Sequence, residues 1–128
     1  MTLRAVKPPH ETRTRILDAA EDLFMQHGFE ATSMRMLTAK AEVNLAAVNY
    51  HFGSKDALIE AVFRRRLDPM NAERLAELDR LEAEANGKPL PPGAIIRAFI
   101  RTSLKMVGDT RSGGRTFVRL LGRTYTEP

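Results

Sequence analysis

Residues 43–55, VNLAAVNYHFGSK, place several chemically capable side chains directly after a short apolar run. Asn49, Tyr50, His51 and Lys55 supply hydrogen-bond donors, hydrogen-bond acceptors and one imidazole. Three uses are open to such a group of side chains. They could form a catalytic cluster, a ligand site, or a polar surface that meets another molecule.

Catalysis fits this segment poorly. A hydrolase of the Ser–His–Asp type needs a serine held in a turn such as G-x-S-x-G, whereas Gly53-Ser54 has the form of a helix end followed by an N-cap. The three histidines, His10, His27 and His51, fall on different elements, and no H-E-x-x-H or EF-hand motif occurs. The absence of cysteine excludes thiolate chemistry. We therefore expect no enzyme, no metal and no cofactor.

The composition permits a nucleic-acid partner without requiring one. The 128 residues suit one domain or slightly more, and the net charge of +4 mildly favours a polyanion. Residues 1–67 and 68–128 each carry 10 Lys and Arg against 8 Asp and Glu, so the positive charge is not concentrated in one half. The basic N-terminus lacks the apolar segment of a signal peptide, and no stretch is long and apolar enough for a membrane span. We expect a cytoplasmic, nucleoid-associated protein.

Apolar spacing predicts an all-α fold. A helix over 11–27 would present one apolar stripe and end at Gly28; its stripe is Ile16, Leu17, Ala20, Leu23 and Phe24. Shorter helices are expected over 33–40, capped by Thr32-Ser33, and over 45–51, capped by Asn44. Ser54 would cap a fourth helix, in which Asp68-Pro69 predicts a kink or a stop and restart. Further helices should follow the loops at 85–93 and 108–114.

Residues 32–55 therefore predict a helix-turn-helix, with a slim second helix for the DNA major groove and donors at its ends for phosphates. Within this arrangement, the segment 28–63 resembles the DNA-binding region of the tetracycline-repressor (TetR) family of bacterial regulators. The ending Tyr50-His51-Phe52-Gly53-Ser54-Lys55 is a specific part of that motif. Glu42 departs from it, because many members have glycine in the turn, and Asn49 stands where an aromatic residue is frequent.

The resemblance implies a homodimer that binds a palindromic operator in double-stranded DNA, as a repressor, and leaves it when a small-molecule effector binds. A lipophilic effector would follow from the weaker similarity to a subgroup with fatty-acid-responsive members. By motif position, the residues expected to contact DNA are Thr32, Ser33, Arg35, Asn44, Leu45, Ala46, Ala47, Asn49, Tyr50, His51 and Lys55. More ordinary roles stay open for several of them. Leu45 could belong to the core, and Tyr50 could be part-buried against the first helix with its hydroxyl exposed. Arg35 and Lys55 could be solvated side chains, and His51 could be a surface or satisfied core histidine.

The expected domains are a basic arm over 1–10, the helix-turn-helix domain over 11–67, and a linker helix with an incomplete regulatory domain over 68–128. Effector-binding residues would come from the last of these and are Phe99, Ile100, Ser103, Leu104, Phe117 and Leu121, for which ordinary helix packing is the alternative. A different reading of the whole chain also remains. It could be a helical small-molecule-binding or interaction module with a vestigial helix-turn-helix.

Overall fold

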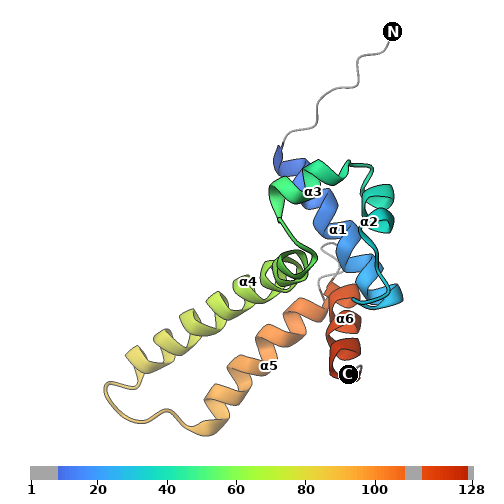
Figure 1. The fold of residues 1–128 in the computed structure, drawn as a ribbon. Helices are drawn as coiled ribbons and strands as arrows, with labels where there is room; N and C mark the ends of the chain where they lie inside the picture. Colours follow the sequence, from blue (N-terminus) through green and yellow to red (C-terminus); the bar gives the residue numbers. More distant parts are fainter. Residues whose placement is uncertain (1–8, 109–113, 127–128) are drawn as a thin grey trace. The chain divides into compact units, whose positions relative to one another are not determined.

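The computed structural model describes residues 9–108 and 114–126, and within these ranges it contains helices and no strand (Figure 1). The predicted all-α fold is confirmed. The helices are α1 (Pro9–His27), α2 (Met34–Ala41), α3 (Leu45–His51), α4 (Lys55–Glu84), α5 (Pro92–Gly108) and α6 (Gly114–Thr126). In the described ranges, no helix combines the length and the hydropathy that crossing a bilayer would demand.

The chain divides into two compact units. The first consists of residues 1–63 together with 119–128, and the second of residues 64–118. Both α4 and α6 therefore contribute one part of their length to each unit.

The first unit has a core built on one face of α1. All five residues of the predicted apolar stripe are buried, and α2, α3 and α4 add side chains of their own, namely Leu37, Ala41, Val48, Leu58 and Val62. Figure 1 shows α2 and α3 lying beside α1 in this unit. Because α2 and α3 are too short to be stable alone, burial of these side chains against α1 is what keeps them helical.

The ends of α1 follow helix-capping chemistry. The helix begins at Pro9, two residues earlier than expected, because proline is compatible with the first helical position. Gly28 follows its last turn at φ 83°, and Phe29 folds back so that its ring lies 5.5 Å from that of Phe24. Arg123 of α6 donates to the carbonyl oxygens of Met25 and Gln26 at 3.2 and 3.3 Å. Residues 1–8 of the expected arm lie outside the described residues.

Helix α4 corrects one expectation. It continues through Pro69 as a single helix, so the predicted stop and restart is wrong, and Asp68 is not an N-cap. Proline removes one N–H donor from the helix, and the remaining bonds on either side keep the segment helical. Asp68 instead lies mid-helix, 3.9 Å from Arg64 one turn earlier.

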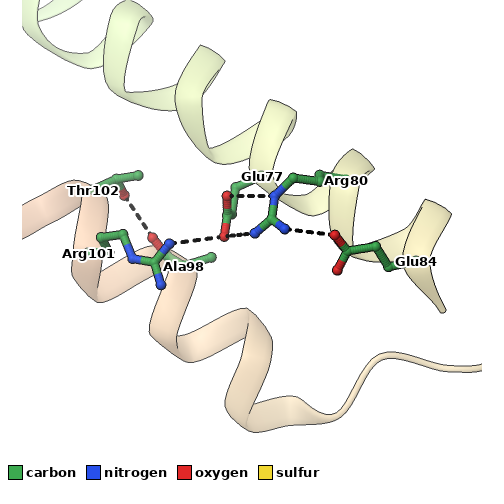
Figure 2. A network of polar contacts seen from close by, with 6 residues as sticks. All are labelled: Glu77, Arg80, Glu84, Ala98, Arg101 and Thr102. Atoms are coloured by element: carbon green, nitrogen blue, oxygen red, sulfur yellow. Dashed lines mark hydrogen bonds and ion pairs between the residues drawn. The ribbon is translucent and has the colours of Figure 1, made fainter.

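In the second unit, polar contacts join α4 and α5, which run side by side in Figure 1. Arg74 donates to the hydroxyls of Thr102 and Ser103, both at 2.7 Å, and lies 4.0 Å from the centroid of the Phe99 ring. Figure 2 shows Glu77 accepting from Arg80 of its own helix and from Arg101 of α5. These contacts lower the pKa of Glu77, mainly through the hydrogen bond from Arg80.

Candidate DNA-binding site

The helix-turn-helix is formed by α2, the turn at residues 42–44 and α3. Ser33 caps α2, because its hydroxyl accepts from the Met36 N–H at 3.1 Å. Asn44 caps α3, because its Oδ1 accepts from the Ala47 N–H at 2.8 Å. Since the side-chain oxygen of Asn44 is used by this cap, its amide NH2 group is the part that can donate to another partner.

Helix α3 buries one side and exposes the rest. Val48 is wholly buried, whereas Leu45 is 51% and Tyr50 is 82% exposed. The side chains of Ala46 and Asn49 are exposed as well. The alternatives that placed Leu45 in the core and packed Tyr50 on the first helix are therefore wrong. Small, apolar and amide side chains on one free face are what a helix needs in order to lie deep in a major groove.

The end of α3 brings donors and aromatic rings together. The His51 ring lies edge-on to Tyr50, with the centroids 5.0 Å apart. Gly53 takes φ 81°, which allows the chain to turn sharply, and Ser54 then caps α4 by accepting from the Ala57 N–H at 3.0 Å. Lys55 opens α4, and its ammonium lies 4.3 Å from the centroid of the Phe29 ring. The contact orients a cation at this helix end.

Arg13 also lies at this end of α3, although it is not among the residues expected to contact DNA. Its guanidinium carbon lies 5.2 Å from the centroid of the ring of Phe52, the C-cap residue of α3. The Arg13 side chain is exposed, so its charge is accessible to a partner. Nothing in the spacing along the chain indicated this contact, because it joins residues of two different helices.

The two polar residues before α2 have different roles. Ser33 is exposed. Thr32 is only 2% exposed, and its hydroxyl donates to the carbonyl oxygens of Gly28 and Leu23 at 2.7 and 3.2 Å. Thr32 therefore faces the protein, and we exclude it from the expected DNA-contacting residues. Arg35, the second residue of α2, is exposed.

The residues expected to bind an effector differ in exposure. Phe99, Ile100 and Leu104 are 56%, 48% and 65% exposed on α5, whereas Phe117 is wholly buried. Ser103 is engaged by Arg74, and Leu121 belongs to the first unit. The second unit contains a cavity of about 340 Å³ between α4 and α5, lined by Ala98 and Thr102 among charged side chains.

The fold and this site define a helix-turn-helix protein, and comparison with known proteins gives its family. Residues 16–62 match the family model described as bacterial regulatory proteins of the tetR family. The segment of the chain that contains the helix-turn-helix therefore belongs to this family, as its sequence motif indicates. The regulators it matches agree with the expectation that the chain is not an enzyme.

Individual relatives extend this similarity. The transcriptional repressor Rv3405c of Mycobacterium tuberculosis is 48% identical over 52 residues, which are 41% of this chain and 28% of that protein. The regulator RutR of Escherichia coli is 33% identical over 106 residues, which are 80% of this chain and 44% of that protein. The chain thus spans less than half of the length of either relative.

The fold of the chain also resembles that of a solved structure. The gamma-butyrolactone receptor described as an ArpA-like protein superposes with a TM-score of 0.61 at 25% sequence identity. The superposition covers 94% of this chain and 57% of that one.

Proposed function

We propose that this chain is a sequence-specific DNA-binding transcriptional regulator, acting as a repressor, that places α3 in the major groove. The observation that carries the proposal is the asymmetry of α3. Val48 alone of its side chains is wholly buried, while Leu45, Ala46, Asn49 and Tyr50 face outward. A short helix that packs on the protein through one buried side can enter the groove with its other sides while it stays packed.

Phosphate contacts would come from residues at the two ends of this helix. Asn44 lies at its start, and Tyr50 and His51 lie at its end, followed by Lys55 at the beginning of α4. Arg13 adds a second cation beside Phe52. Phosphate contacts of this kind set register and supply affinity that is independent of sequence and sensitive to salt.

Sequence preference would come from the exposed face of α3 and from Arg35 of α2. An asparagine such as Asn49 can pair with adenine, and an arginine such as Arg35 can pair with guanine. The apolar side chains of Leu45, Ala46 and Ala47 suit thymine methyl groups. Together they offer direct readout over a few base pairs.

We further propose that the protein binds a palindromic operator as a homodimer in the cytoplasm and that a small molecule releases it. Family membership supports this regulatory scheme, and one structural relative is by its title a receptor for gamma-butyrolactone. The exposed apolar side chains Phe99, Ile100 and Leu104 favour a lipophilic effector that would bind the second unit. Their exposure gives such a ligand apolar surface to cover.

Selection of bound duplexes from a random DNA pool tests the proposal directly. We expect one recovered motif, with two half-sites related by a dyad if the protein binds as a dimer. The logarithm of the binding constant for that duplex should fall linearly with the logarithm of salt concentration. Recovery of no motif, together with binding that is insensitive to salt, would refute the proposal.

A second candidate is a small-molecule-binding or interaction module whose helix-turn-helix no longer binds DNA. It is favoured by the exposed apolar side of α5, which includes Ile96 at 57% and Leu104 at 65% exposure. Titration of the protein with acyl ligands, measured by isothermal titration calorimetry, distinguishes the two candidates. Tight binding of a ligand by a chain that selects no DNA motif would favour the second candidate.

A further inference from the structure

The turn between α2 and α3 contains a residue in an unfavourable conformation. Glu42 adopts φ 56° and ψ 48°, a left-handed conformation that glycine adopts freely and that a residue with a Cβ adopts at a cost. Its side chain is 80% exposed, so packing of that side chain does not hold it there. The backbone of the turn must therefore be held by other contacts.

Arg15 of α1 supplies such contacts. Its Nη2 donates to the carbonyl oxygen of Ala41, and lies 3.4 Å from both the carbonyl oxygen and the carboxylate of Glu42. The last carbonyls of a helix have no partner within that helix, and the helix dipole favours a cation beside them. Arg15 is thus a cap for the C-terminus of α2 that is provided by another helix.

The backbone contacts of Arg15 matter more than its ion pair. The Arg15 side chain is 23% exposed, so its bonds to carbonyl oxygens are partly shielded from water, whereas the Glu42 carboxylate is largely solvated. Ion pairs with a solvated partner contribute little. The Val43 N–H donates to the Thr38 oxygen at 3.1 Å across the same turn, so the carbonyl contacts of Arg15 reinforce a backbone geometry that is already hydrogen-bonded.

We propose that Arg15 is a positioning residue for DNA recognition, which holds the left-handed turn at Glu42 and thereby the direction in which α3 leaves α2. This inference rests on the proposed function. Asn44 caps α3 only two residues after the turn, and Val48 is the wholly buried anchor of α3. A change in the turn therefore moves the whole DNA-facing surface of α3.

The chain offers a matched control for this contact. Lys40 of α2 pairs with Asp22 of α1 at 2.5 Å, which links the same two helices through side chains alone. Lys40→Met removes one charge and one link between α1 and α2, as Arg15→Met does, without touching the carbonyls of the turn. An effect that comes from the turn should therefore appear in Arg15→Met and be absent in Lys40→Met.

Amide hydrogen exchange of the whole chain, without DNA, tests the contact itself. We expect Arg15→Met to speed exchange of the Val43 N–H by about tenfold, because local opening of the turn becomes easier. Arg15→Lys should give a smaller increase, since lysine restores the charge without the planar fork of donors. Lys40→Met should leave this amide unchanged. Equal exchange at Val43 in wild type and both Arg15 variants would overturn the inference.

The effect on recognition is tested by a double-mutant cycle with Glu42→Gly, which allows the left-handed turn without strain. Affinity is measured for the duplex that the wild-type chain selects from a random pool. Arg15→Met should weaken binding less in the Glu42→Gly background than in wild type, with a coupling of roughly threefold to a hundredfold. The Lys40→Met cycle should show no coupling. Additive losses in the Arg15 cycle would overturn the positioning role.

The two proposals fail in different ways. If the wild-type chain selects no duplex, the proposed function fails, and hydrogen exchange alone decides whether Arg15 holds the turn. If Arg15→Met does not fold, as judged by circular dichroism, Arg15→Lys replaces it in both experiments.

Discussion

The guanidinium of Arg13 lies over the ring of Phe52, with its central carbon 5.2 Å from the ring centroid. This contact joins the N-terminal part of α1 to Phe52, the C-cap residue of α3. It adds a cation to the end of α3 that already carries Tyr50 and His51. The phosphate-binding surface that we propose therefore draws on α1 as well as on α3 and the start of α4.

Substitution of Arg13 should weaken binding to all DNA sequences alike. Arg13→Gln removes one cation that we expect to contact phosphate, so the slope of log affinity against log salt should fall by about 1. Fluorescence anisotropy with the selected duplex and an unrelated duplex, at several salt concentrations, measures both effects. Lys88→Gln, in the exposed loop between α4 and α5, provides the same change in net charge. An equal slope in both variants would argue against a phosphate contact.

Substitution of Asn49 should change sequence preference more than affinity. The side chain is exposed on α3, so Asn49→Ala should leave folding unaffected. If Asn49 pairs with one base, its loss should cost about 1–3 kcal/mol at that position alone. Repeating the selection with Asn49→Ala should then give a motif that is relaxed at one position of each half-site. An unchanged motif would remove Asn49 from the base-reading residues.

Thr32 and Ser33 should differ in how they affect stability and binding. Thr32→Val removes the buried hydroxyl that donates to the carbonyl oxygens of Gly28 and Leu23, and should lower the free energy of unfolding by about 1–2 kcal/mol. Affinity of the folded protein for DNA should stay the same. Ser33→Ala removes the α2 cap and should cost about 1 kcal/mol. Urea unfolding measures the stability of each variant, and DNA titration measures its affinity. Weaker DNA binding by fully folded Thr32→Val would indicate that Thr32 contacts DNA after all.

Glu77 should make the stability of the protein depend on pH in the acid range. Its pKa is lowered from 4.5 in the folded state, so its contribution is present above 4.5 and is lost as pH falls through the lower, folded value. The difference in melting temperature between wild type and Glu77→Gln should therefore shrink as pH falls below 4.5. Glu82→Gln matches the change in charge on the same helix. A difference that is constant with pH would contradict this account.

Local chemistry made much of this structure predictable. Ser33 and Asn44 are good N-caps because their side chains reach backbone amides three residues away, and Gly28 ends α1 because it tolerates positive φ. Such signals act over one helical turn, so they can be read from consecutive residues. The bounds of α3 could be predicted for this reason.

Contacts between distant residues could not be predicted in the same way. Arg13 with Phe52 and Arg15 with Ala41 depend on how α1 packs against later helices, and a single sequence gives no sign of that packing. Thr32 was misjudged because threonine and serine are both common caps, and burial decided which one faces inward. The effector-binding residues stay a prediction, because apolar spacing along helices does not show whether they line one pocket.

The exposure of Tyr50 has a practical consequence for optical spectroscopy. The chain has no tryptophan and two tyrosines, of which Tyr50 lies on the free face of α3 and Tyr125 near the end of α6. Tyr125→Phe would leave Tyr50 as the sole strong emitter in the protein. Quenching of its fluorescence would then follow the approach of a nucleic acid to α3 in real time, without any attached dye.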